Sequence, residues 1–220
     1  MSTIYSPSSG MQNTAEPTGL CNGLPLPGDN QQLISRTLPI GNLPITLRAF
    51  NPDTDINTLY KWMSLEFEGP LKTKATPPRG LLDSYSCMME SDFARPFMGL
   101  VNDMPVCQMN VFKASQDILS LRYNSRPGDY GLQMVTAPLC VSDNLTALLR
   151  ASVEYFFSFR DTVRIVTEID VRNEWHFNMF TKIGFRMSTK LTTTYRTAHL
   201  YACTRDSLKR SAGKSSLFLR

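Results

Sequence analysis

The sequence predicts a mixed α/β domain in which strands and helices share one hydrophobic core. Two observations support this class. The 220 residues are 42% hydrophobic and only 19% charged, a balance that is sufficient to bury a large core. Segments of strand type and helical type also follow one another as strand, two helices, three or four strands, helix, strand, helix and two strands. Antiparallel strands combined with helical crossovers are typical of α+β or mixed α/β domains.

Composition divides the chain into three regions. Residues 1–44 contain six of the fourteen prolines and lack hydrophobic periodicity over most of their length, so we expect an extended, partly disordered N-terminal arm. Residues 45–208 have regular patterns and form the folded domain. Residues 209–220 contain Lys209, Arg210, Lys214 and Arg220 without an acidic residue, and we interpret them as a solvated basic tail.

The first half of the folded domain is expected to be one strand, two helices and a run of strands. Alternating apolar residues predict the strands, and apolar residues three or four apart predict the helices. Asn51 and Asp53 are the caps for the first helix, and Asn102-Asp103 is the turn of a hairpin. The expected elements are a strand at 45–50, helices at 56–65 and 81–93, and strands at 96–101, 105–112, 118–123 and 130–136.

The second half contains the strongest helical pattern in the chain. Within 145–157, six residues from Leu145 to Phe156 fall on one helix face. A buried strand at 163–168 follows, and Asn173 then caps a helix that Gly184 ends. The last two strands are expected at 185–188 and 192–203.

Charge and cysteine content argue against several functions. The net charge of +4 is mild for a nucleic-acid binder, and basic residues do not alternate with aromatic ones. The five cysteines are scattered without a CxxC pair, and with two histidines they offer no zinc spacing, so no metal site is expected. Neither a secretory leader nor a membrane span is evident, and we therefore expect a cytoplasmic protein.

Several short motifs carry a resemblance to a known family. The motifs are Lys61-Trp62-Met63, Pro96–Gly99 with Pro105-Val106, Arg126–Leu132, Glu168–Asn173, Lys182–Phe185 and Arg196–Arg205. In the order and spacing of these motifs the chain resembles the siderophore-biosynthesis acyltransferases of the GNAT fold, the branch that contains aerobactin N6-hydroxylysine acetyltransferase. The resemblance extends from about Leu47 to Leu208.

The resemblance implies both a fold and a reaction. The fold is a central, mostly antiparallel sheet with helices on both faces. The reaction is the transfer of an acyl group from acyl-CoA to an amine or hydroxylamine in hydroxamate siderophore biosynthesis. The thioester would lie between two splayed parallel strands, here 130–136 and 163–168. A small amine or amino-acid-derived acceptor is the implied substrate, and a siderophore synthetase or a second copy of the chain is the implied partner.

The resemblance also assigns residues to the site. Asp170 matches the family's aspartate, and Gln133 stands where the family has a histidine, so these are the candidate catalytic residues. The candidate substrate-binding residues are Glu168, Asn173, Arg196 and His176. The candidate CoA-binding residues are Val135, Ser142, Asn144 and Thr146.

Two departures from the family leave alternatives open. A glutamine at position 133 can orient a substrate but is no general base. The stretch Pro138–Thr146 contains neither the glycines nor the basic residue of a phosphate loop, and Asp143 adds a negative charge. The alternative function is therefore a catalytically degenerate GNAT-fold protein that serves as a binding or assembly partner. Asp170 is alternatively a helix cap, and His176 is alternatively a packing residue of its helix.

Overall fold

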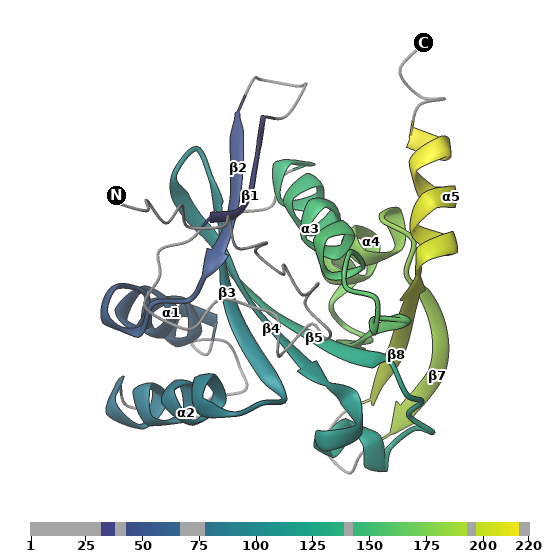
Figure 1. Cartoon of the computed structure of the whole chain (residues 1–220), viewed down its shortest axis with the longest axis horizontal. Helices are drawn as coiled ribbons and strands as arrows, with labels where there is room; N and C mark the ends of the chain where they lie inside the picture. The colour runs from purple at the N-terminus through teal and green to yellow at the C-terminus, as the bar shows by residue number, and fades with distance from the viewer. Residues whose placement is uncertain (1–31, 38–42, 67–77, 139–142, 193–196, 216–220) are drawn as a thin grey trace, which may run out of the picture.

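A single mixed sheet organises the molecule. The computed structural model describes residues 32–37, 43–66, 78–138, 143–192 and 197–215. Eight strands lie in the order β1-β2-β3-β4-β5-β6-β8-β7 (Figure 1). Every neighbouring pair is antiparallel except β5 and β6, which are parallel. The predicted fold class, a mostly antiparallel mixed sheet with helices, is confirmed.

The element boundaries follow the expected order with local differences. The strands are β1 Gln32–Thr37, β2 Pro44–Ala49, β3 Ala94–Val101, β4 Met104–Lys113, β5 Asp129–Thr136, β6 Arg164–Asp170, β7 Arg186–Thr192 and β8 Thr197–Thr204. The helices are α1 Pro52–Glu66, α2 Pro78–Glu90, α3 Asp143–Phe156, α4 Glu174–Lys182 and α5 Arg205–Ser215, with short 3₁₀ turns η1 Ala114–Gln116 and η2 Ile118–Leu121.

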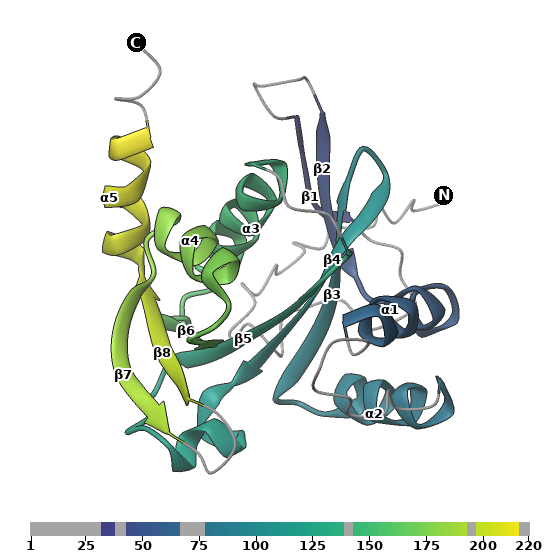
Figure 2. The same ribbon diagram turned by 180° about the vertical axis from the view of Figure 1, so that it is seen from behind.

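Helices cover both faces of the sheet. Helices α3 and α4 pack on one face, where Leu148, Phe156 and Phe180 join the largest core cluster. Helices α1 and α2 pack on the opposite face, where Leu59 and Tyr85 belong to a second cluster. Figures 1 and 2 show the two helix pairs on either side of the central strands. Strand β6 is covered differently, because its Val166 belongs to a third cluster with Ala114 of η1 and Leu119 of η2.

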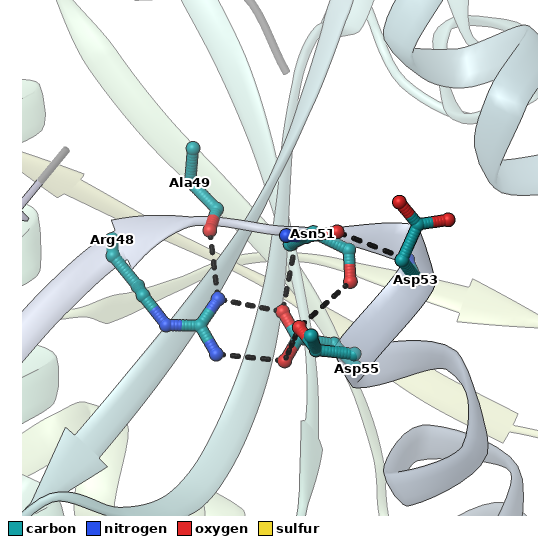
Figure 3. Close-up of polar contacts among 6 residues, drawn as sticks. Arg48, Ala49, Asn51, Asp53 and Asp55 are labelled. Carbon is teal, nitrogen blue, oxygen red and sulfur yellow. Dashed lines mark hydrogen bonds and ion pairs between the residues drawn. The ribbon is translucent and has the colours of Figure 1, made fainter. Parts of the chain in front are cut away.

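Helix α1 is fixed to the sheet through a buried ion pair. Asn51 caps the helix as predicted, since its side-chain oxygen accepts the Asp53 N–H at 3.0 Å. Asp55, whose side chain is 4% exposed, accepts two hydrogen bonds from the Arg48 guanidinium of β2 at 2.6 and 2.7 Å. It also accepts the Asn51 N–H at 2.9 Å (Figure 3). The first turn of α1 is therefore attached to β2 at a defined position.

The structure corrects three expectations. Residues 118–123 are not a strand: 118–121 form η2, because the Asp117 carboxylate accepts the Leu119 N–H and closes a 3₁₀ turn. The N-terminal arm, predicted over 1–44, contains strand β1, in which Ile34 is 7% exposed and packs into the main core. The basic tail, predicted from 209, begins inside α5, which extends from Arg205 to Ser215.

We predict that the N-terminal arm divides into a dispensable part and a structural part. Deleting residues 1–31 should leave the melting temperature nearly unchanged, because this stretch lacks a periodic apolar face. Deleting residues 1–37 also removes β1 and the buried Ile34, whose burial alone stabilises by about 1.5–3 kcal/mol. Thermal unfolding of both truncations measures the difference. Equal losses in the two truncations would show that residues before 32 pack into the fold.

Candidate active site

The two parallel strands part shortly after they pair. Strands β5 and β6 are paired only where Asp129–Gly131 meets Arg164–Val166. Beyond this point β4 still follows β5 as far as Thr136, and β8 still follows β6 as far as Asp170. The outer neighbours thus hold each strand in place while the inner edges separate. Alternate backbone groups of β5 after Gly131 consequently face the gap rather than a neighbouring strand.

A buried ion pair holds the closed end of this gap. The Arg164 guanidinium donates to both Asp129 carboxylate oxygens, at 2.8 and 2.5 Å, and the Asp129 side chain is only 1% exposed. Tyr123 Oη and the Arg126 N–H donate to the same carboxylate. The hydrogen bonds that Arg164 donates to Asp129 raise the pKa of Arg164, so the guanidinium stays charged. It fixes the two strands at the point where they begin to diverge.

A close approach next to this ion pair requires glycine. A Cβ built on Gly131 would lie 2.1 Å from the Phe112 ring of the adjacent strand β4. The ring occupies the space beside the strand and is itself 5% exposed. The glycine of the predicted motif therefore has a packing role at the closed end of the gap.

A cavity of about 230 Å³ lies in the gap on the side of α4. Strands β5 and β6 contribute most of its lining, and α4 closes it. The lining residues are Gln133, Met134, Thr167, Glu168, Ile169, His176 and Phe180. Three predicted site residues, from different parts of the chain, therefore meet in one cavity: Gln133, Glu168 and His176.

A second cavity of about 120 Å³ opens toward η2. It is lined by Phe112, Asp117, Ile118, Leu119, Arg122, Leu132, Gln133, Val166, Thr167 and Glu168. Gln133, Thr167 and Glu168 line both cavities, so the two cavities adjoin at these residues. Two molecules that approach from opposite faces can meet at these residues.

Glu168 is the carboxylate placed in the gap. Its side chain is 15% exposed, and its Oε2 accepts a hydrogen bond from Arg122 Nη1 at 3.3 Å. The two cations close to it in sequence have other partners, because Arg172 pairs with Asp170 and Lys182 pairs with Asp143 at 3.6 Å. Glu168 thus lines the gap and pairs with Arg122, the residue that follows η2.

His176 enters the first cavity as a neutral side chain. Burial lowers its pKa to about 4 from 6.5. Asn173 Oδ1 accepts the His176 backbone N–H at 3.0 Å, so the Asn173 amide nitrogen is the group that contacts His176 Nδ1. Nδ1 is then an acceptor, and the proton is on Nε2. Nε2 is buried and makes no hydrogen bond within the described part of the chain.

The neutral state of His176 also affects stability. Because the folded pKa is about 4, the unfolded chain binds a proton more readily. The contribution of His176 to the free energy of unfolding is fully present above about pH 6.5, and it is lost as the pH falls toward 4.

Asp170 lies outside both cavities. Its carboxylate accepts from Arg172 Nε and Nη2 at 2.9 and 2.8 Å, and also from the Arg172 backbone N–H. Together with Asn173 and Trp175 it lines a more open depression of about 640 Å³ at the end of β6. The predicted catalytic residues Asp170 and Gln133 therefore line different hollows.

The predicted CoA-binding residues are spread along β5 and α3. Val135 packs against the α1/α2 cluster, whereas Asn144 and Thr146 lie in the first turn of α3. Lys182, at the end of α4, lies beside Asp143 at the start of α3 and supplies a cation there. Ser142 and Arg196 lie outside the described residues.

Sequence reasoning missed two cations at the site. Arg122 contacts Glu168 across 46 positions, and Lys182 contacts Asp143 across 39 (182 minus 143). Lys182 belongs to a motif that the sequence analysis singled out, but its partner was not evident. No local pattern marks Arg122, since its segment has strand-like alternation and forms a 3₁₀ turn.

The fold and a comparison with known protein families together show the class of protein to which the chain belongs. A mixed sheet whose two parallel strands separate around a polar gap defines an N-acyltransferase domain of the GNAT type. Residues 51–193 match the family model described as Acetyltransferase (GNAT) domain. Since the match covers more than half of the chain, the chain belongs to this family.

Individual relatives are distant. The chain is 24% identical over 102 residues to the lysine N-acyltransferase MbtK of Mycobacterium sp. (strain MCS). This match covers 46% of the chain, and it spans less than half (42%) of that relative.

Solved structures agree with the fold. An uncharacterized protein (bh2621) from Bacillus halodurans superposes with a TM-score of 0.71 at 20% identity, over 83% of this chain and 94% of that one. AAC(6')-Ib in complex with ribostamycin and coenzyme A superposes with a TM-score of 0.65 at 22% identity, over 76% and 96%. At these identities the likeness establishes the fold.

None of the helices in the described ranges is long and apolar enough to cross a membrane. No group of three metal-ligating side chains occurs within the same ranges.

Proposed function

We propose that the chain transfers an acyl group from acyl-CoA to the amine or hydroxylamine of a lysine- or ornithine-type acceptor, as in the biosynthesis of hydroxamate siderophores. One observation carries the proposal: Glu168 lines both cavities that adjoin at the gap between β5 and β6. Membership of the GNAT family and the similarity to a lysine N-acyltransferase support it. A siderophore synthetase that uses the product remains part of this proposal, as does a cytoplasmic location.

The thioester fits the gap between β5 and β6. Backbone groups of β5 beyond Gly131 are available to the amides of the pantetheine arm, and a backbone N–H can stabilise the oxyanion. The pyrophosphate would lie at the first turn of α3, where Lys182 offsets the charge of Asp143 and Asn144 and Thr146 offer polar groups.

The reaction then needs a proton acceptor and a stabilised leaving group. The acceptor nitrogen attacks the thioester carbon, the carbon–sulfur bond breaks, and the nitrogen's proton passes to Glu168. Gln133 orients the acceptor from the opposite strand through its side-chain amide. The Nε2–H of the neutral His176 donates a hydrogen bond to the departing thiolate of coenzyme A and keeps its proton. We assign the proton acceptor to Glu168 rather than Asp170 because only Glu168 lines the gap.

A second candidate function is a GNAT-fold binding partner without turnover. The observation in its favour is the start of α3, where a glycine-free stretch and Asp143 stand at the position of the phosphate site. Lys182 argues against this candidate, because it brings a positive charge to that position.

Release of free coenzyme A thiol tests the two candidates. Acetyl-CoA and longer acyl-CoAs are supplied with lysine, N6-hydroxylysine, ornithine or cadaverine. The proposal predicts turnover with at least one of these amines, and stabilisation of the protein by about 2.7 kcal/mol when acyl-CoA is at about 100 times its Kd. Absence of both turnover and a thermal shift would favour the binding-partner function.

A further inference from the structure

Arg122 is a cation at the entrance of the smaller cavity that the proposed reaction does not yet use. Its side chain is 32% exposed, and its guanidinium makes one hydrogen bond within the described residues, from Nη1 to Glu168 Oε2 at 3.3 Å. That separation is longer than the 2.7–2.9 Å that is usual for a charge-assisted hydrogen bond. An arginine has five N–H donors in a planar fork, so most of this fork remains available to a ligand.

The walls beside Arg122 suit an aliphatic chain. Leu119, Leu132 and Val166 are buried apolar side chains of this cavity, and Ile118 lies at its outer edge with 64% exposure. Asp117 also lines the cavity, but its carboxylate is occupied as the cap of η2. The cavity therefore presents an apolar wall beside the Arg122–Glu168 ion pair.

The charges of Arg122 and Glu168 define the kind of ligand that this cavity can bind. Glu168 lines both cavities, whereas Arg122 lines only the one that opens toward η2. A ligand with an ammonium group at Glu168 and a carboxylate at the outer edge of Arg122 meets both charges of the existing ion pair. A planar carboxylate is the group that a guanidinium fork binds best.

We propose that Arg122 binds the carboxylate of the acyl acceptor, so that the substrate is an amino acid with a free carboxylate, an aliphatic chain and a distal amine. The inference rests on the proposed function and specifies its acceptor. The acceptor enters from the η2 side, its chain lies along Leu119, Leu132 and Val166, and its amine reaches Glu168 and Gln133. Acyl-CoA occupies the gap from the α3/α4 side.

The test compares acceptors with and without the carboxylate. Lysine and cadaverine differ in this group alone, and N6-hydroxylysine serves as the second carboxylate-bearing acceptor. In the wild type, kcat/KM should be higher for lysine than for cadaverine. Arg122→Met should lower kcat/KM for lysine by about 10- to 100-fold more than for cadaverine, the range expected for one hydrogen bond between charged groups. Any effect of the variant that acts through Glu168 is shared by the two acceptors and cancels in this comparison. Arg122→Lys should restore part of the loss.

Two controls distinguish a loss of acceptor binding in Arg122→Met from a loss of the folded structure. Arg160→Met removes one exposed cation that lines neither cavity, and it should change kcat/KM for neither acceptor. Equal melting temperatures of wild type and Arg122→Met would show that the variant is folded. Equal losses for lysine and cadaverine in Arg122→Met, or equal wild-type efficiency for the two acceptors, would overturn the inference.

Binding of the acceptor, measured without turnover, tests the carboxylate site independently of the proposed reaction. Calorimetry of lysine and cadaverine with the protein alone requires no turnover. Lysine binding that weakens in Arg122→Met would support the carboxylate site. If acyl-CoA is not consumed, the proposed reaction is rejected, but this support for the carboxylate site stands. Lysine binding that Arg122→Met leaves unchanged, or no binding in either protein at millimolar lysine, would overturn the carboxylate site even if acyl transfer proceeds.

Discussion

Glu168→Gln is expected to lower the turnover number of acyl transfer by about 10²–10⁴-fold, the usual contribution of a positioned proton acceptor. The amide keeps the size of the side chain but takes no proton from the attacking nitrogen. Affinity for acyl-CoA should change little, because the carboxylate receives the acceptor rather than the cofactor. Steady-state kinetics with saturating acyl-CoA measure the effect, and calorimetry measures the affinity.

Asp170→Asn is the matched control for this prediction. The family resemblance assigns catalysis to Asp170, whereas its carboxylate pairs with Arg172 outside both cavities. If Glu168 is the proton acceptor, the loss in Asp170→Asn should be far smaller than the loss in Glu168→Gln. The reverse order of losses would return the catalytic role to Asp170 and reject our assignment.

Asp129→Ala is expected to cost about 3–5 kcal/mol of unfolding free energy, the range for removing one partner of a buried ion pair. The substitution leaves the Arg164 guanidinium, 16% exposed, without the carboxylate that it contacts twice. It also removes the acceptor of Tyr123 Oη. Chemical denaturation of wild type and variant gives the difference, and Asp83→Asn, on the exposed face of α2, should stay within about 0.5 kcal/mol.

A double variant tests the cause of that loss. Asp129→Ala combined with Arg164→Met removes both charges, so the penalty of an unpaired buried cation disappears. The double variant should therefore be more stable than Asp129→Ala alone. A double variant that loses the sum of the two single losses would show that the ion pair is not the reason for the instability.

Local signals in the sequence predicted the helices well. The one-face pattern of Leu145–Phe156 corresponds to α3, and Asn173 caps α4 with its side chain as expected. Gly184 has φ = 112°, and a Cβ there would lie 2.6 Å from the Ser207 carbonyl oxygen, so glycine is required for two reasons. Asn102 and Asp103 both have positive φ, which agrees with the predicted tight hairpin turn. Each of these features depends on residues that are close in sequence.

Features that depend on distant residues were not predictable in the same way. Ile118 and Leu121 are exposed around the buried Leu119, a pattern that suits an edge strand as well as a 3₁₀ turn. Strand β1 is short, and its position is visible only through its pairing with β2.

The same limit applies to the candidate site. The resemblance identified Gln133, Glu168 and His176, but only the separation of β5 from β6 shows that they share a cavity while Asp170 does not. Arg122 becomes a candidate only when its contact with Glu168 is seen.

Hydrogen–deuterium exchange of β5 with and without acyl-CoA tests the central claim most directly. If the thioester and its pantetheine arm lie between β5 and β6, the backbone amides of 132–136 that face the gap should exchange more slowly in the presence of saturating acyl-CoA. Amides of the same strand that bond to β4 serve as the internal reference. Slower exchange confined to the gap-facing amides is the predicted result. Unchanged exchange at a concentration that saturates binding by calorimetry, or protection at another site, would contradict the claim that this gap is the acyl-CoA site.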